Sequence, residues 1–211
     1  MITRFSVKWF FFREQLKVIA RYYSRGRFAL LDLAYGLVAL VWNPYRVCRK
    51  FLQRRGSPEP FAYGETPLTE FQRLMEAVGL TAADRYVELG SGRGKTCLWA
   101  ALFVGCGVRG VEWVPQFVRL ARSLSQMLRI PAVFEERSML ETTLSDATVV
   151  YFYGIDREIE PLLPLFEQMP RTARLITISE PLASSSWELV RSLAVSFPWG
   201  KTEAFLHVKV N

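Results

Sequence analysis

Residues 85–95 decide the fold and read Arg-Tyr-Val-Glu-Leu-Gly-Ser-Gly-Arg-Gly-Lys. The first five, Arg85–Leu89, are rich in apolar and aromatic side chains and predict a buried strand. Residues 95–104 have the composition of a buried helix. Between them stand three glycines at alternate positions. Glycine adopts positive φ without a steric penalty and lets a ligand approach the backbone closely. The stretch therefore predicts a strand, a ligand-binding turn and a helix.

Three ligand classes compete for this turn. A phosphate-binding loop needs G-x-x-x-x-G-K-[ST], and Gly94-Lys95-Thr96 supplies its end, but the first glycine would fall on Leu89. A dinucleotide-binding turn needs G-x-G-x-x-G, and here the third glycine comes one residue early. The third class is the E/D-x-G-x-G-x-G turn that binds S-adenosylmethionine (AdoMet). The carboxylate of Glu88 disfavours an anionic pyrophosphate and suits the ammonium group of a cofactor that carries an amino acid.

A second acid supports the AdoMet interpretation. Glu112 lies near the end of the next predicted strand, Val108–Trp113, 24 residues after Glu88. A carboxylate in this place can accept both hydroxyls of a ribose. Further strands are predicted at 132–135, 148–152, 173–179 and 203–210, and further helices at 66–78, 115–128 and 158–169. Thr66-Pro67 is expected to open the first of these helices, with the Thr66 hydroxyl at the N-cap and Pro67 as the first helical residue. Helices that alternate with strands predict an α/β fold with a doubly wound, mostly parallel sheet.

Several motifs together carry a family resemblance: Tyr63-Gly64-Glu65-Thr66, Val87–Gly92, Glu136–Leu140, Arg174–Ile176, Glu180–Leu182, Trp199–Lys201 and Leu206-His207. The stretch 85–113 resembles the class I, seven-strand AdoMet-dependent methyltransferases. Residues 61–211 are similar, more specifically, to the non-SET histone-lysine methyltransferase of the disruptor-of-telomeric-silencing type. The lysine methyltransferases of mitochondrial membrane proteins share the glycine motif and also place a hydrophobic segment before the domain. The resemblance implies a Rossmann-like sheet of seven strands.

The resemblance also implies the site residues. Those expected to bind the cofactor are Glu65, Thr66, Glu88, Gly90, Ser91, Gly92, Gly94, Lys95, Glu112, Trp113, Ser138 and Met139. Glu88 would face the methionine end and Glu112 the ribose. Ser138 replaces an aspartate that binds adenine, so adenine recognition would rest on Met139 and backbone groups. In the acceptor channel, Thr66 matches a family residue and Tyr153 replaces an asparagine.

The chemistry expected of this site is methyl transfer. It needs alignment of nucleophile, methyl and sulfur more than acid–base groups. A lysine acceptor must be neutral although its ordinary pKa is about 10.4, and the aromatic residues 151–153 would favour the neutral form by desolvation. We therefore predict a protein-lysine N-methyltransferase. Two alternatives are a small-molecule or lipid N-methyltransferase and a non-catalytic AdoMet-binding interaction module.

The numbers of histidines and cysteines limit which metal sites, catalytic sites and disulfides the chain can form. One histidine, His207, excludes a multi-histidine metal or catalytic site, and no metal is expected. The three cysteines, Cys48, Cys97 and Cys106, are too few and too scattered for a disulfide framework. They indicate a reducing compartment, here the cytoplasmic side of a membrane.

The positive charge is concentrated at the N-terminus. Residues 1–55 hold 12 Lys and Arg but 2 Asp and Glu, whereas residues 56–211 hold 15 and 18. Such asymmetry indicates an anionic partner for the first segment. A membrane surface is the first choice and nucleic acid the second. The Gly- and Pro-rich residues 56–62 predict a linker between this arm and a methyltransferase domain at 63–211.

The arm has two apolar segments. Trp9, Phe12, Leu16, Ile19 and Tyr23 recur at helical spacing, with Arg13, Lys17, Arg21 and Arg25 on another face. This pattern is typical of a helix that lies in a membrane interface. Residues 28–42 form an apolar run with Asp32 as its one charge, which is short for a span of roughly 20 residues. The run fits a span or a hairpin dipping into one leaflet, and a helix pair buried on the domain remains the alternative.

Overall fold

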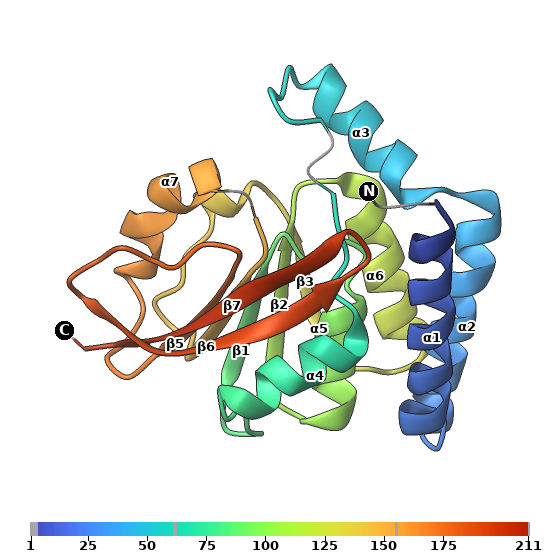
Figure 1. The fold of residues 1–211 in the computed structure, drawn as a ribbon, viewed down its shortest axis with the longest axis horizontal. Coiled ribbons are helices and arrows are strands. Elements are labelled where there is room, and N and C mark those ends of the chain that lie inside the picture. Colours follow the sequence, from blue (N-terminus) through green and yellow to red (C-terminus); the bar gives the residue numbers. More distant parts are fainter. Residues whose placement is uncertain (1–3, 61–62, 155, 211) are drawn as a thin grey trace.

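A computed structural model describes residues 4–60, 63–154 and 156–210. These residues form a central seven-stranded sheet in the order β3-β2-β1-β4-β5-β7-β6 (Figure 1). The strands are β1 (Arg85–Leu89), β2 (Gly107–Glu112), β3 (Val133–Glu136), β4 (Val149–Phe152), β5 (Arg174–Ile178), β6 (Trp187–Phe197) and β7 (Gly200–Lys209). Neighbouring strands pair in parallel from β3 to β5, and β7 pairs antiparallel with both β5 and β6. The predicted Rossmann-like α/β sheet is confirmed.

Helices cover both faces of this sheet. They are α1 (Arg4–Tyr22), α2 (Gly26–Val41), α3 (Pro44–Arg54), α4 (Leu68–Ala77), α5 (Lys95–Phe103), α6 (Pro115–Met127) and α7 (Asp156–Phe166), with a short 3₁₀ turn η1 (Met139–Glu141). Helices α4, α5 and α6 share one buried apolar cluster with the sheet, and α7 packs in the cluster on the other face. This double cover is why the central strands are apolar along most of their length.

One strand and one helix are absent from the sequence prediction. Most residues between 188 and 193 of β6 are exposed, so the alternation that marks a half-buried strand is weak there. Helix α3 begins at Asn43-Pro44, the pair that directly follows the predicted apolar run 28–42. The side chain of Asn43 accepts a hydrogen bond from the Arg46 amide, and Pro44 is the first helical residue, so the pair is also a helix start.

The start of α4 differs from its prediction. Thr66 does not cap this helix, because its hydroxyl lies 2.6 Å from that of Tyr151. Glu14 of α1 takes over this role. Its carboxylate accepts hydrogen bonds from the backbone N–H and the hydroxyl of Thr69, at 2.9 and 2.8 Å. An acid at a helix N-terminus is favourable for both hydrogen bonding and the helix dipole. The arm therefore stabilises the first helix of the sheet domain.

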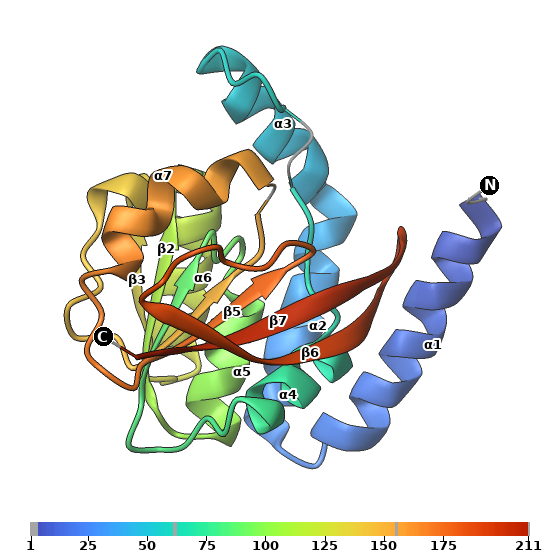
Figure 2. The same ribbon diagram turned by 60° about the vertical axis from the view of Figure 1, so that its left-hand side comes forward.

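The arm packs against the domain as a helical hairpin, α1 and α2, which Figure 2 shows beside α4 and the β6–β7 hairpin. Tyr22 contacts Trp99 and Phe103 of α5, with ring centroids 6.0 and 5.3 Å apart. Tyr22, Phe28 and Tyr35 belong to the same buried cluster as Trp99. The hydrophobic core is thus continuous across the predicted linker, of which residues 61 and 62 lie outside the described part of the chain.

Much of the apolar surface of the arm remains exposed. The exposed stripe of α1 contains Phe5, Trp9, Phe12, Leu16 and Ile19, and that of α2 contains Leu30, Leu33, Leu37, Leu40 and Val41. Tyr23 does not belong to the exposed stripe, because it is half-buried and its hydroxyl donates to Asp32 at 2.8 Å. No single described helix is long and apolar enough to cross a membrane. Helices α2 and α3 together satisfy length and composition, but they meet at an angle of 64°.

Candidate functional site

The predicted site residues gather at the carboxyl ends of β1, β2 and β4. The register pairs Glu88 of β1 with Gly110 of β2 and Tyr151 of β4, so the turn after β1 and the acid that ends β2 lie at one edge of the sheet. In parallel sheets this edge is where ligands bind. Gly94 has φ +78°, and a Cβ there would stand 2.6 Å from the ring of Phe134. The last position of the turn therefore requires glycine, because no larger residue has either the space or the backbone freedom.

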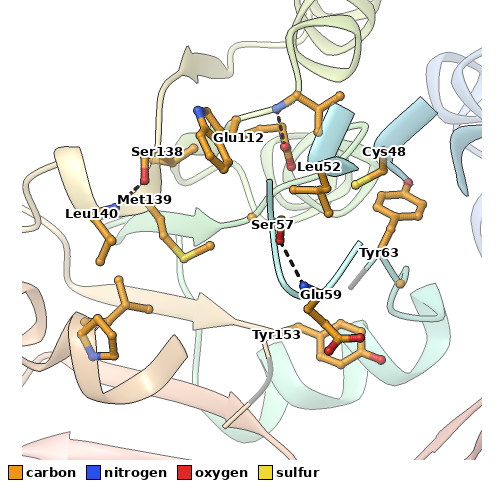
Figure 3. A pocket seen from close by; sticks show the side chains of 17 residues that line it. Cys48, Leu52, Ser57, Glu59, Tyr63, Glu112, Ser138, Met139, Leu140 and Tyr153 are labelled. Atoms are coloured by element: carbon orange, nitrogen blue, oxygen red, sulfur yellow. Dashed lines mark hydrogen bonds between the residues drawn. The ribbon is translucent and has the colours of Figure 1, made fainter. Parts of the chain in front are cut away.

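The larger of two adjoining cavities has a volume of about 300 Å³. Figure 3 shows Glu112, Met139, Tyr63 and Tyr153 around its space. The predicted cofactor residues that line it are Gly90, Glu112, Trp113, Ser138 and Met139. Cys48 and Leu52 of α3 and Ser57 and Glu59 of the linker also line it, and the sequence analysis did not include them. Asn43-Pro44 was the signal for α3, but nothing in the spacing indicates that this helix covers the cavity.

The smaller cavity, of about 50 Å³, lies against the glycine turn. It is lined by Gly64, Glu65, Thr66, Glu88, Leu89, Gly90, Ser91, Gly92, Arg93, Lys95, Thr96, Tyr151 and Tyr153. The two cavities share Gly64, Gly90 and Tyr153. Of the predicted site residues, Gly94 alone lines neither cavity. Its contribution is the backbone conformation that brings α5 to the turn.

Glu112 holds the turn in place. Its carboxylate accepts hydrogen bonds from the backbone N–H groups of Gly92 and Val114, at 2.8 and 2.7 Å. Burial raises its pKa, and these hydrogen bonds partly oppose the rise. One side chain therefore links the end of β2 to the turn that follows β1, and it lines the larger cavity with the acceptor capacity that remains.

Glu88 is buried at the base of the smaller cavity. Its carboxylate accepts hydrogen bonds from the Thr96 hydroxyl at 2.7 and 2.8 Å and from the Tyr86 hydroxyl at 3.1 Å. Burial raises the pKa of Glu88 to about 7, despite these hydrogen bonds. A carboxyl group in this range changes its charge near neutral pH. A cationic group placed beside it would favour the ionised form.

Two ion pairs surround the smaller cavity. Arg93 donates to both carboxylate oxygens of Glu65, at 2.6 and 2.8 Å, and Lys95 lies 2.5 Å from Asp32 of α2. Burial disfavours the charged form of Asp32, but the ammonium of Lys95 and hydrogen bonds from Gln15 and Tyr23 hold its pKa below the usual range. The one charge in the apolar run of the arm is therefore a contact to the glycine turn. Neither Arg93 nor Asp32 was a predicted site residue.

Of the two predicted acceptor residues, Tyr153 lies at the junction of the cavities and Thr66 lines the smaller one only. Thr66 and Tyr153 both line the smaller one. The hydroxyl of Tyr153 accepts a hydrogen bond from the indole N–H of Trp199 at 2.9 Å, and burial raises its pKa. Tyr153 is therefore neutral and fixed in place. Ser138 also has a local partner, because its hydroxyl accepts from the Leu140 amide at 3.3 Å at the start of η1.

The histidine and the three cysteines considered in the sequence are all buried. The imidazole Nε2 of His207 accepts a hydrogen bond from the Leu182 amide at 3.1 Å inside the sheet. Cys48, Cys97 and Cys106 are buried and free. Within the described ranges, no group of three or more His, Cys, Asp or Glu side chains is arranged to hold a metal ion.

Comparison with known proteins agrees with this geometry. The sequence model of the family described as "Histone methylation protein DOT1" matches residues 50–135, which run from α3 through the turn to β3. No curated protein sequence gives a significant match. The family match therefore covers the part of the chain that builds most of both cavities.

Similar solved structures include methyltransferases that act on different substrates. An RNA methyltransferase from Salinibacter ruber, solved in complex with S-adenosyl-L-homocysteine, is 23% identical with a TM-score of 0.63, over 70% of this chain and 95% of that one. The B. subtilis M1A22 tRNA methyltransferase TrmK is 13% identical with a TM-score of 0.57, over 67% and 65%. A geranyl diphosphate C-methyltransferase from Streptomyces coelicolor A3(2), solved with S-adenosyl-L-homocysteine, is 13% identical with a TM-score of 0.57, over 68% and 79%.

These structures resemble this chain in the sheet and in the helices that pack on it. Together with the family match they support the broad class of AdoMet-dependent methyltransferases, while two of the three proteins are named for RNA or tRNA and the third for geranyl diphosphate. The chain has the class I methyltransferase fold.

Proposed function

We propose that this protein is an AdoMet-dependent methyltransferase whose acceptor is a lysine side chain of a protein. The observation that carries the proposal is the pair of buried acids, Glu88 and Glu112, at the ends of neighbouring strands in one cleft. The larger cavity suits an adenosine, with Glu112 for the ribose and Trp113 and Met139 as apolar walls. The smaller cavity suits an amino acid, with Glu88 for its ammonium and Lys95 near its carboxylate.

Two further observations support the fit of AdoMet to these two cavities. The buried hydroxyl of Ser91 and the buried Nη1 of Arg93 have no hydrogen-bond partner among the described residues, and both residues line the smaller cavity. Buried polar atoms without partners are costly unless a ligand or water supplies them. At Gly90, where φ is +72°, the space in front of the backbone is open. The turn can thus receive a polar ligand at short range.

The residues around the junction suit an amine acceptor. When bound, AdoMet supplies a methyl group on a cationic sulfur; the amine nitrogen accepts it, the C–S electron pair stays on sulfur as a thioether, and the amine proton leaves to solvent. Burial raises the pKa values of Tyr151 and Tyr153, so neither phenol serves as a base. Their part is to exclude water and to orient the amine, whose neutral form is favoured by desolvation.

A second candidate acceptor is a lipid or small molecule. A groove of about 600 Å³ runs between α1 and α2 to the glycine turn. Its walls include Phe10, Phe11 and Leu37 of the arm, and its inner end includes Thr66 and Lys95. An apolar groove with polar groups at one end suits an amphiphile. A module that binds AdoMet without catalysis is the third interpretation.

The arm is proposed to bind an anionic membrane. The ten residues of the two exposed stripes have exposed fractions between 43% and 93%, which is more apolar surface than a solvated helix pair usually presents. Arg13, Lys17 and Arg21 on α1 and Arg46 and Lys50 on α3 are also exposed. Basic residues beside an apolar helix face are typical of interfacial membrane helices. Nucleic acid remains the rival partner for this charge. Free cysteines favour a reducing compartment, on the cytoplasmic side of the membrane.

Affinity for S-adenosylhomocysteine should depend on pH through Glu88. The ligand's ammonium requires the ionised carboxylate, and the pKa of Glu88 without ligand is about 7. Binding is therefore expected to be constant above pH 7 and to weaken below it, by up to about tenfold per pH unit. Calorimetry on the full-length protein between pH 5.5 and 8.5 measures this. The Glu88→Gln variant should bind S-adenosylhomocysteine more weakly at pH 8, and its affinity should depend much less on pH. An unchanged pH dependence in this variant would show that another group titrates.

Labelled methyl transfer distinguishes the acceptors. The full-length protein is incubated with methyl-labelled AdoMet and either washed membranes or soluble extract. We expect label in a protein band, recovered as methyl-lysine after hydrolysis, and at least about 100-fold less with Glu88→Ala, since a buried charge partner is lost. Label in the lipid fraction would favour the second candidate. Binding of AdoMet without any transfer would favour the non-catalytic module.

Liposome flotation tests the arm. Vesicles with anionic lipid should retain the protein at low salt, with about 1 kcal/mol from each basic residue near the surface. Binding should persist in part at high salt, because burial of apolar side chains does not depend on counterions. Leu37→Glu should release the protein, and Leu189→Glu, the same change at an exposed leucine of β6 distant in sequence from the arm, is the matched control. Binding to DNA with a steep salt dependence and no flotation at any salt would show that the arm binds nucleic acid instead.

A further inference from the structure

A third cavity opens beyond Tyr153, on the side of the arm. We call it the vestibule. It has a volume of about 370 Å³ and is lined by Val7, Phe11, Tyr45, Tyr63, Gly64, Glu65, Tyr153, Pro198 and Trp199. These residues come from α1, α3, the segment after the linker, the end of β4 and the tip of the β6–β7 hairpin. Both ribbon views place that tip beside the N-terminal half of α1.

The vestibule meets both cofactor cavities at one place. Gly64 and Tyr153 line all three. A Cβ at position 64 would lie 3.2 Å from two atoms of the Tyr153 side chain, which is tighter than ordinary contact. Glycine therefore leaves room for the Tyr153 side chain at the passage between the three cavities. Tyr153 itself is fixed by the ring of Phe197, 4.9 Å away, and by the indole of Trp199.

The wall chemistry selects for a cation. Five lining side chains are aromatic, and the one charged side chain, Glu65, is already paired with Arg93, so the aromatic faces determine the preference. Among the described residues, no Lys or Arg lines this cavity. Aromatic faces attract ammonium groups, by about 0.5–2 kcal/mol, whereas a phosphate-bearing acceptor such as RNA would need cationic groups.

We propose that the vestibule is the entrance for the amine acceptor and that Phe11 and Tyr45 of the arm determine which amines enter. This rests on the proposed methyltransferase function and adds a specificity role for residues outside the matched family region, 50–135. Phe11 lines the vestibule, while its neighbour Phe12 lies on the exposed stripe of α1 and does not line the vestibule; the two side chains are similarly exposed, at 47% and 54%. The arm therefore serves as a wall of the substrate site, and Phe12 offers a matched control.

A bisubstrate probe tests this without knowledge of the natural acceptor. The probe is a nitrogen analogue of AdoMet whose central nitrogen carries a five-carbon chain that ends in an ammonium group. A second probe ends in a hydroxyl. For each variant, calorimetry on the full-length protein gives the ratio of the Kd of S-adenosylhomocysteine to that of the probe.

We expect the ammonium probe to bind more tightly than S-adenosylhomocysteine, and the hydroxyl probe to lose most of that gain. Phe11→Ala and Tyr45→Ala should lower the ratio about fivefold or more, with the Kd of S-adenosylhomocysteine within twofold of wild type. Phe12→Ala should change neither value. Thermal unfolding identifies any variant that fails to fold, and Phe11→Leu then replaces Phe11→Ala.

The result that overturns the proposal is a ratio unchanged by both arm substitutions, or an equal gain for the hydroxyl probe. These outcomes would leave the cofactor assignment intact. Failure of the wild-type protein to bind S-adenosylhomocysteine would instead overturn the methyltransferase proposal, and the entrance with it.

Discussion

The site depends on two hydrogen bonds that the carboxylate of Glu112 accepts. They come from the backbone N–H groups of Gly92 in the turn and of Val114 at the start of α6. The first bond fixes the turn between β1 and α5, and the second fixes the approach to the next helix. A buried carboxylate with two such donors is held in one orientation, because an unmade hydrogen bond to it would be costly. Gly92 lines the smaller cavity and Val114 the larger one, so this one side chain fixes part of the wall of each.

The arm is coupled to the same turn from the other side. Asp32 pairs with Lys95 at the start of α5, and the Tyr35 hydroxyl donates to the backbone oxygen of Arg93 at 2.6 Å. Glu14 completes the N-terminus of α4. Whatever docks on the outer face of α1 and α2 therefore acts on a helix pair of which α2 contacts Arg93 and Lys95 directly. The proposed membrane attachment would act through the same two helices.

The parts that were predictable from the sequence are those set by local spacing. The glycines of the turn, with Glu88 before them and Glu112 one strand later, locate the cleft because strand, turn and helix periods are short-range features. Strands β1 to β5 follow from the same signals. Thr66 was a reasonable helix cap by residue type, but Tyr151, 85 residues away, provides its partner. The roles of Asp32 and Glu14 could not be predicted, because spacing does not show which distant group a charge will meet.

The acceptor side was the least predictable for the same reason. Tyr153 was placed by its position after β4, and its neighbours Phe197 and Trp199 come from a hairpin whose first strand has no clear apolar alternation. Phe11 and Tyr45 reach the vestibule only through the packing of the arm. Residues that come together from four separate elements leave no motif in a single sequence.

We propose that Glu112 binds the ribose of AdoMet in the larger cavity. Calorimetric titration of the full-length protein with S-adenosylhomocysteine, for wild type and Glu112→Gln, tests it most directly. The substitution keeps the size of the side chain and removes the charge-assisted hydrogen bonds, which are worth about 1.5–3 kcal/mol each. We expect the variant to bind S-adenosylhomocysteine at least about tenfold more weakly, and the wild-type protein to bind S-adenosylhomocysteine more tightly than NADH. Equal affinity in the two proteins, or tighter binding of NADH, would contradict it.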